Sequence, residues 1–259
     1  MEMVSKVSKG SIMDQIYLPK KRASLPVGSY VVVSPLTTKR EGRKLYYHHV
    51  HSLEPIKVAL MHQIFDIIKN QGECDNIIIT GSFLEKGFRF NDVDILVITE
   101  NTVNKQVLEK KLENMLNIQV QILALSFDAL LQGVATDPLY ELMLDKYVAK
   151  RRIIYRVKRR CNYKVLDLHL LKSKTLMENF DHLSGREKYY WVRNTVAIFL
   201  FLTNKKVTMH AIENEIEKTL NTSAIKVKEN MLNKKEFLRK FKEYYAKTFE
   251  KVSRGFDAE

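Results

Sequence analysis

The sequence predicts an α/β (α+β) protein with an α-helical domain in its C-terminal part. Two short apolar runs rich in β-branched residues, 77–79 and 95–98, have the length and composition of buried strands. Segments with apolar residues at every third or fourth position, as in amphipathic helices, lie on both sides of these runs. After Cys161 the strand-like runs stop and only helical patterns follow. These observations define the fold class.

The composition predicts a basic cytoplasmic protein of one or two domains. The 259 residues suffice to bury a core, and the formal net charge of +13 favours nucleic acid, nucleotides or an acidic partner. Cys74 and Cys161 offer no disulfide framework and fit a reducing compartment. The first ten residues lack the apolar region of a signal peptide, and the longest apolar cluster, 196–202, is too short to span a bilayer. We therefore expect no membrane partner.

The first 50 residues are expected to form a basic arm and a β-hairpin. Residues 1–28 are basic and show no sustained period, whereas 30–33 and 45–47 have strand character and flank a polar turn. Basic residues in this turn stand near Tyr46 and Tyr47. Such a combination suits contact with a nucleotide or nucleic-acid strand, or a solvated face above two core tyrosines.

A helix is predicted to follow, from Ser52 to about Asn70. Ser52 is a suitable N-cap, Pro55 suits the first turn, and apolar residues recur at helical spacing up to Ile68. Gly72 marks the end of this helix. The strand at 76–80 comes next.

Two small residues and two aspartates form the central motif of the chain. The pair Gly81-Ser82 ends the first strand, and Asp92-Val93-Asp94 opens the second strand, at 92–98. Successive strand residues point to opposite faces, so Asp92 and Asp94 share a face. Adjacent carboxylates repel each other and are costly to desolvate, and a divalent cation such as Mg²⁺, bound together with substrate phosphates, relieves both costs. The alternative is an ordinary strand–loop–strand segment whose aspartates cap a turn.

This arrangement resembles the nucleotidyltransferase superfamily typified by DNA polymerase β, whose pattern is hydrophobic-Gly-Ser, a spacer, and Asp-x-Asp on a strand. The closest resemblance is to the minimal and antibiotic-type members, and it covers roughly residues 55–157. It implies a small mixed sheet with flanking helices, and an enzyme dependent on Mg²⁺ (or Mn²⁺). Such an enzyme transfers a nucleoside monophosphate from an NTP, for example ATP, to a hydroxyl acceptor. By this resemblance Asp92 and Asp94 are the catalytic metal ligands, and Gly81 and Ser82 hold the triphosphate.

The chain departs from the family pattern in the loop after Gly81-Ser82. Small members often read Gly-Ser-x-Ala-Arg-Gly, whereas the sequence here is GSFLEKG, with no arginine at the family's position. Lys86 or Arg89 is our hypothesis for the missing positive charge toward phosphate.

A second departure concerns the family's third carboxylate, which falls on the strand predicted at 118–123. The aligned residue is Gln121. An amide ligates metal weakly and cannot act as a base. Either the carboxylate comes from elsewhere, with Glu100 and Asp128 as candidates, or catalysis is weakened or absent.

The remaining elements before residue 161 are predicted from shorter signals. We expect helices at 102–115, at 126–130 and from Asp137 to about Val148, and an edge strand at 152–155 that resembles the last strand of the family's core. The segment 150–160 holds seven lysines and arginines, the densest basic run in the chain. It suits contact with phosphates or a solvated edge strand guarded by charge.

Helical patterns occupy the rest of the chain. They cover about 166–182, a helix that opens with a Ser184–Glu187 capping box, 208–220, and a last helix from about Lys234. We thus expect a basic arm and hairpin at 1–50, a nucleotidyltransferase domain at 51–160 and a helical domain at 161–259. In the resembling family a fused helical domain commonly holds the acceptor, which would be a protein hydroxyl, a small molecule or an RNA end.

Two other interpretations stay open at this point. One is a nucleotidyltransferase-fold protein that has lost turnover and binds nucleotide or RNA through its basic surface; Gln121 and the net charge favour it. The other is a toxin–antitoxin component that acts with a helical partner, although here a helical region is already fused.

Overall fold

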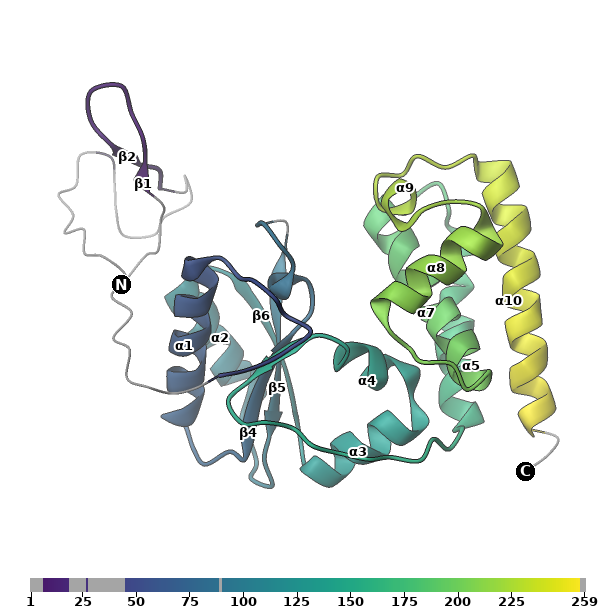
Figure 1. The fold of residues 1–259 in the computed structure, drawn as a ribbon, viewed down its shortest axis with the longest axis horizontal. Coiled ribbons are helices and arrows are strands. Elements are labelled where there is room, and N and C mark those ends of the chain that lie inside the picture. Colours follow the sequence, from purple (N-terminus) through teal and green to yellow (C-terminus); the bar gives the residue numbers. More distant parts are fainter. Residues whose placement is uncertain (1–6, 19–26, 28–44, 89, 257–259) are drawn as a thin grey trace. The chain divides into compact units, whose positions relative to one another are not determined.

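The computed structural model describes residues 7–18, 27, 45–88 and 90–256, and these form two compact units (Figure 1). The sheet unit contains the chain up to Ser126 together with Tyr147–Ile153. The helical unit contains Phe127–Lys146 and the chain from Ile154 onward. Our expected boundary after residue 160 therefore differs from the division in the structure, which assigns 127–146 to the helices.

The sheet unit is built on a five-stranded mixed sheet with strand order β3-β7-β4-β5-β6. The strands are β3 (Tyr46–His48), β4 (Asn76–Thr80), β5 (Asp92–Ile98), β6 (Gln119–Leu125) and β7 (Tyr147–Ala149). β5 and β6 run parallel, and the other neighbouring strands run antiparallel. A separate two-stranded ladder joins β1 (Val7–Ser8) and β2 (Gln15–Ile16).

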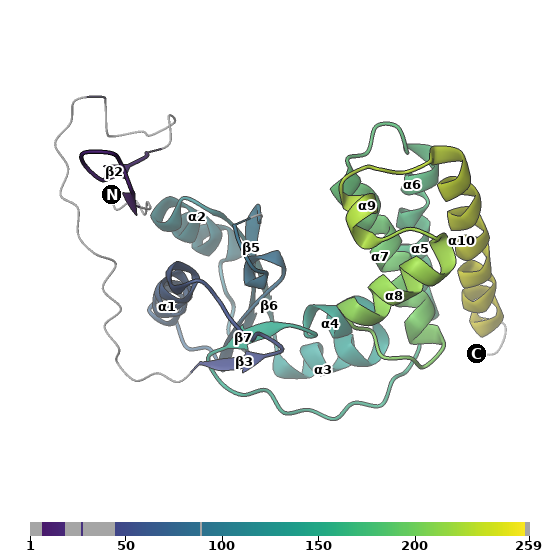
Figure 2. The same ribbon diagram turned by 45° about the horizontal axis from the view of Figure 1, so that its top comes forward.

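Two helices, α1 (Pro55–Lys69) and α2 (Lys105–Leu116), cover one face of this sheet (Figures 1 and 2). Alternate strand residues supply the core beneath them, because strand side chains alternate between faces. Both predicted central strands, 76–80 and 92–98, are confirmed. The core of this unit includes Met61, Ile64, Ile77, Ile79, Val93, Ile95, Val97, Leu112 and Ile122.

The helix α1 begins three residues later than its predicted N-cap, Ser52. The N-cap is Glu54, in an extended conformation, and it makes no side-chain capping bond. Because Pro55 disfavours helical geometry in the residue before it, the helix cannot begin earlier. The helix predicted at 102–115 likewise begins at Lys105, and its N-cap is Asn104.

The strand predicted at 152–155 was wrong. The strand that completes the sheet is β7, at Tyr147–Ala149, and it lies between β3 and β4 rather than at an edge. All three residues of this internal strand are buried, so both of its faces are covered, which suits Tyr147, Val148 and Ala149 but not the charged segment after them. The helix predicted to reach Val148 accordingly ends at Met143.

The helical unit contains α3 (Phe127–Thr136), α4 (Pro138–Met143), α5 (Tyr163–Ser173), α6 (Thr175–Glu178), α7 (Gly185–Leu202), α8 (Met209–Leu220), α9 (Ala224–Lys228) and α10 (Lys234–Phe256). The capping box at Ser184 and Glu187 is confirmed as the start of α7. This helix is buried along most of its length, and α5 and α10 pack beside it (Figures 1 and 2). Within the described ranges, no helix combines the length and apolar character needed to cross a bilayer.

Candidate functional site

The two aspartates of the central motif lie at the beginning of β5. They point to the same face of the sheet, as the alternation of strand side chains requires. Val93 is fully buried in the core under α1 and α2, whereas Asp92 and Asp94 are half-buried on the opposite face. In the sheet register Asp94 pairs with Thr80 on β4 and with Gln121 on β6. The two carboxylates therefore share one end of the sheet with the last residue of β4.

Gly81 follows directly on β4 and lies against the side chain of Asp94. Its φ is 79° and its ψ is −163°, a backbone region open essentially to glycine alone. A Cβ at this position would collide with Oδ2 of Asp94. Both the conformation and the close approach thus require glycine. Ser82, the next residue, is exposed and begins the short 3₁₀ helix η1 (Ser82–Leu84).

Gln121 occupies the place that the family resemblance gives to a third carboxylate. Its Nε2 donates a hydrogen bond of 2.7 Å to Oδ2 of Asp92. The structure therefore brings Gly81, Asp92, Asp94 and Gln121 together, on two adjacent strands, β5 and β6, and the turn that follows β4. The amide orients the Asp92 carboxylate by donating to it, which a carboxylate at 121 would not do at neutral pH.

The other predicted site residues lie elsewhere. Lys86 is exposed in the loop between β4 and β5, and Arg89 is outside the described residues. Glu100 follows the C-terminal end of β5, the opposite end of that strand from Asp92. This position removes Glu100 as a source of the third carboxylate. Asp128 belongs to α3 in the helical unit.

A buried lysine that the sequence analysis missed holds the loop between β4 and β5. Lys57, in the first turns of α1, is fully buried, and its Nζ donates to the carbonyl oxygen of Glu85 at 2.5 Å. Three aromatic rings of the loop surround this ammonium at 5.4–5.6 Å from their centroids; they belong to Phe83, Phe88 and Phe90. The cation–π contacts and the hydrogen bond compensate for the burial of the charge.

Glu54 completes this contact from the residue before α1. One carboxylate oxygen lies 3.1 Å from Lys57 Nζ, and the other accepts the backbone N–H of Gly87 at 2.6 Å. The Gly87 hydrogen bond, followed by the carboxylate's other hydrogen bonds and its attraction to Lys57, lowers the pKa of Glu54 to about 2. Glu54 and Lys57 together tie the start of α1 to both halves of the loop. We call this pair the loop clamp.

The sequence carried a signal for the loop clamp. Lys57 stands four residues before Met61, and Met61, Ile64 and Ile68 mark the buried stripe of α1. A charged residue on such a stripe requires buried partners. Its partners were not predictable, because Glu85 lies 28 positions away in the sequence.

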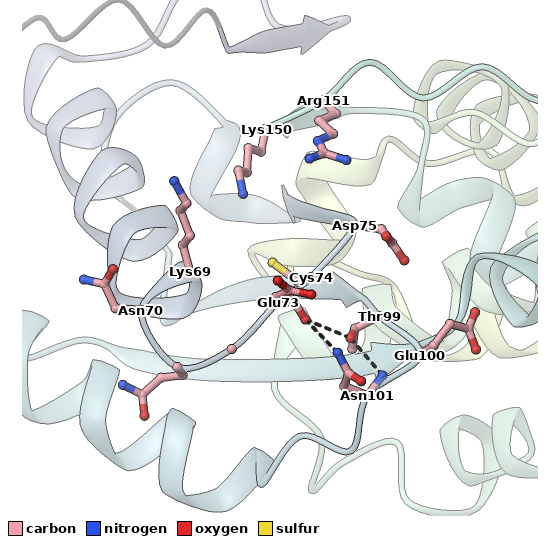
Figure 3. A pocket seen from close by; sticks show the side chains of 12 residues that line it. Lys69, Asn70, Glu73, Cys74, Asp75, Thr99, Glu100, Asn101, Lys150 and Arg151 are labelled. Carbon is pink, nitrogen blue, oxygen red and sulfur yellow. Dashed lines mark hydrogen bonds between the residues drawn. The ribbon is translucent and has the colours of Figure 1, made fainter.

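A separate hollow of about 740 Å³ lies at the opposite end of the sheet, beyond Asn76 and Thr99 (Figure 3). Lys69, Lys150 and Arg151 line it beside Cys74. Burial raises the pKa of the Cys74 thiol, although the positive charges of Lys150 and Arg151 oppose this shift. The thiol is therefore protonated at neutral pH and is a poor nucleophile. Three acidic residues, Glu73, Asp75 and Glu100, also line the hollow.

Comparison with known proteins adds no relative to this description: no family model, no curated protein and no solved structure matches the chain. Among the residues that the structure describes, no three or more His, Cys, Asp or Glu side chains are grouped to hold a metal ion. The possible metal ligands at the start of β5 are fewer than the three side chains of such a group. They are two half-buried carboxylates on one face, which fit a divalent cation that takes its other ligands from water and phosphate oxygens.

Proposed function

We propose that this protein is a metal-dependent nucleotidyltransferase, which transfers a nucleoside monophosphate from an NTP to a hydroxyl acceptor. The observation that carries the proposal is the placement of Gly81 against Asp94 at the end of the sheet where Asp92 also lies. A glycine in a glycine-only conformation beside paired carboxylates is costly for a purely structural turn. The same arrangement leaves the backbone at Gly81 and Ser82 open to a phosphate group.

Each residue has a distinct part in this proposal. Asp92 and Asp94 hold the Mg²⁺ or Mn²⁺, and Gln121 fixes the orientation of the Asp92 carboxylate. When bound, the cation supplies charge neutralisation for the triphosphate. The backbone at Gly81 and Ser82 receives the phosphates, and the loop clamp keeps that backbone in position.

Transfer to a hydroxyl acceptor also requires a group that takes up the proton of that hydroxyl. Gln121 cannot take up this proton, and its NH₂ group is already engaged with Asp92. This hydrogen bond favours a second candidate function, a nucleotidyltransferase-fold protein that binds nucleotide or RNA with little or no turnover.

A transfer experiment distinguishes the two functions. The purified protein is incubated with each α-labelled NTP, Mg²⁺ or Mn²⁺, total RNA and cell extract, beside the Asp94→Asn and Gln121→Asp variants. The enzyme predicts label in an acceptor and its loss in Asp94→Asn. Gln121→Asp removes the hydrogen bond to Asp92 but adds a base and a metal ligand, so faster labelling in this variant would show that the missing base limits the wild type. The nature of the labelled species identifies the acceptor class.

An absence of label transfer favours the second function. If the wild type and Gln121→Asp both transfer no label while nucleotide binding is measurable and depends on Asp94, the protein is a nucleotide-binding module. If the protein binds neither nucleotide nor RNA, both candidate functions are wrong.

A further inference from the structure

The basic run 150–160 is not a strand, and its geometry separates its cations into two sets. Residues 152–160 form no helix or strand, and the segment between β7 and α5 is a long loop (Figure 2). We call its last six residues, 155–160, the basic strap. Along it exposed side chains alternate with less exposed ones: Arg156, Lys158 and Arg160 are exposed, and Val157 and Arg159 are half-buried.

Arg159 anchors the basic strap to the helical unit. Its guanidinium forms a two-pronged ion pair with Glu141 of α4, with N–O distances of 2.5–3.1 Å, and donates to the carbonyl oxygen of Lys205 at 2.7 Å. It also lies 5.0 Å from the ring centroid of Phe201. The next residue, Arg160, donates its backbone N–H to the carbonyl of Ala135 at 2.8 Å. The backbone of the basic strap is thus held against α3 and α4.

The three exposed cations have no comparable partner among the residues that the structure describes. Arg156, Lys158 and Arg160 form no ion pair with any residue in the described part of the chain, although carboxylates elsewhere pair with several exposed lysines. In an extended chain such alternate residues lie about 7 Å apart on one side. A fixed backbone with a row of unpaired cations suits an extended polyanion.

An exposed aromatic residue directly precedes this row in the sequence. Tyr155 is 38% exposed, next to Ile154, which is 75% exposed. An exposed tyrosine adjacent in sequence to a line of cations is the combination that binds unpaired bases by stacking while the phosphates contact the cations. An acidic polypeptide would form ion pairs with the cations, but its carboxylate side chains would not stack on the tyrosine ring as a base does.

We propose that the basic strap is a binding site for single-stranded nucleic acid, in which Arg156, Lys158 and Arg160 contact successive phosphates and Tyr155 stacks on a base. This site rests on the binding function considered above and deepens it, because it names single-stranded nucleic acid as the ligand. It requires neither nucleotide nor metal. Binding is therefore tested without them, so that failure here and failure of nucleotidyl transfer are distinguishable.

The experiment measures the affinity of the full-length protein for a labelled 20-nucleotide single strand over a series of salt concentrations. Each phosphate contact with a single strand contributes about 0.7 to the slope of log affinity against log salt. The variant with Arg156→Gln, Lys158→Gln and Arg160→Gln should therefore lower the slope by about 2. Tyr155→Ala should weaken binding about tenfold without changing the slope, and Tyr155→Phe should bind like the wild type.

A matched control removes the same charge elsewhere. Lys110, Lys111 and Lys218 are exposed on α2 and α8, and their triple change to Gln should keep the wild-type slope. RNA and DNA strands of one sequence show whether the 2′-hydroxyl contributes, and polyglutamate tests general attraction to acid. The proposal is wrong if the wild type binds neither strand, if the two triple variants behave alike, or if polyglutamate competes as well as the strand does.

Discussion

At the scale of single residues, the sharpest feature is the contact between Gly81 and Asp94. Gly81→Ala should impair nucleotide binding, because the new Cβ must displace the Asp94 carboxylate. It should also lower the free energy of unfolding by about 1–3 kcal/mol, the cost of forcing a side chain into this backbone region. Denaturant unfolding and nucleotide titration measure the two effects.

The chain offers a control for this prediction in Gly87. Its φ is also positive, at 87°, but a Cβ added there meets nothing within 4 Å. Gly87→Ala should therefore show the conformational cost alone and leave nucleotide binding close to that of the wild type. Equal effects of the two changes on nucleotide binding would show that the collision with Asp94 is unimportant.

The loop clamp makes a prediction about acid stability. Glu54 has its pKa lowered from 4.5 to about 2 in the folded protein, so the folded state favours its ionised form. A group with a lowered pKa stabilises the protein above the unfolded-state value and loses that contribution as the pH falls through the folded-state value. Between pH 5 and pH 2, the unfolding free energy of the wild type should fall more steeply than that of Glu54→Gln. Parallel curves over this range would contradict the contact.

Lys57 is expected to act on the loop and not on the reaction itself. Lys57→Met keeps the length of the side chain but leaves the Glu85 carbonyl without its donor, which costs about 1–3 kcal/mol. Because the loop then loses its fixed position, nucleotide affinity should fall as well. Lys69→Met, an exposed change on the same helix, should alter neither quantity. A destabilised Lys57→Met protein with unchanged nucleotide affinity would limit Lys57 to a structural role.

At the scale of elements, β6 forms an edge of the sheet that α2 protects. Glu113 accepts the backbone N–H of Val120 at 3.2 Å, and Glu109 accepts that of Ile122 at 2.7 Å. These N–H groups would otherwise be available to pair with a strand of another molecule. Two carboxylates four residues apart on α2 thus reach two N–H groups that are two residues apart on β6.

Removal of both carboxylates should expose this edge. The Glu109→Ala, Glu113→Ala protein is expected to be less stable by about 1–3 kcal/mol and to self-associate at high concentration, as seen by light scattering. The Glu109→Gln, Glu113→Gln protein retains amide oxygens that accept the same bonds and should stay closer to the wild type. If the alanine variant shows no greater association than the glutamine variant, the carboxylates do not guard the edge.

At the scale of the whole molecule, the sequence was sufficient wherever local pattern and packing agree. The strands at 76–80 and 92–98, the shared face of Asp92 and Asp94, and the α7 capping box were all predictable, because each depends on neighbours within a few residues. β7 was not, because three residues carry no period and their pairing with β3 and β4 is determined by distant strands. The buried partners of Lys57 were not predictable for the same reason, because Glu85 lies 28 positions away in the sequence.

The division of the chain between units was also non-local, and it yields a final prediction. Residues 127–146 precede β7 in the chain but pack with helices that follow it: Leu142 belongs to the helical core, and Asp137 contacts His169 at 2.9 Å. Asp145 also accepts the backbone N–H of Met209, the first residue of α8, at 2.9 Å. A fragment that begins at residue 161 loses these contacts.

The comparison of two fragments tests this assignment. Residues 161–259 should unfold at lower denaturant concentration and less cooperatively than residues 127–259, because Leu142 no longer covers the core and the start of α8 loses its carboxylate. In fragment 127–259, Asp145→Ala should lower the midpoint part of the way, since α8 then loses that hydrogen bond while Leu142 stays in place. Equal midpoints for the two fragments would mean that α3 and α4 contribute nothing to the helical unit, and the boundary after residue 160 would then describe the folding units better.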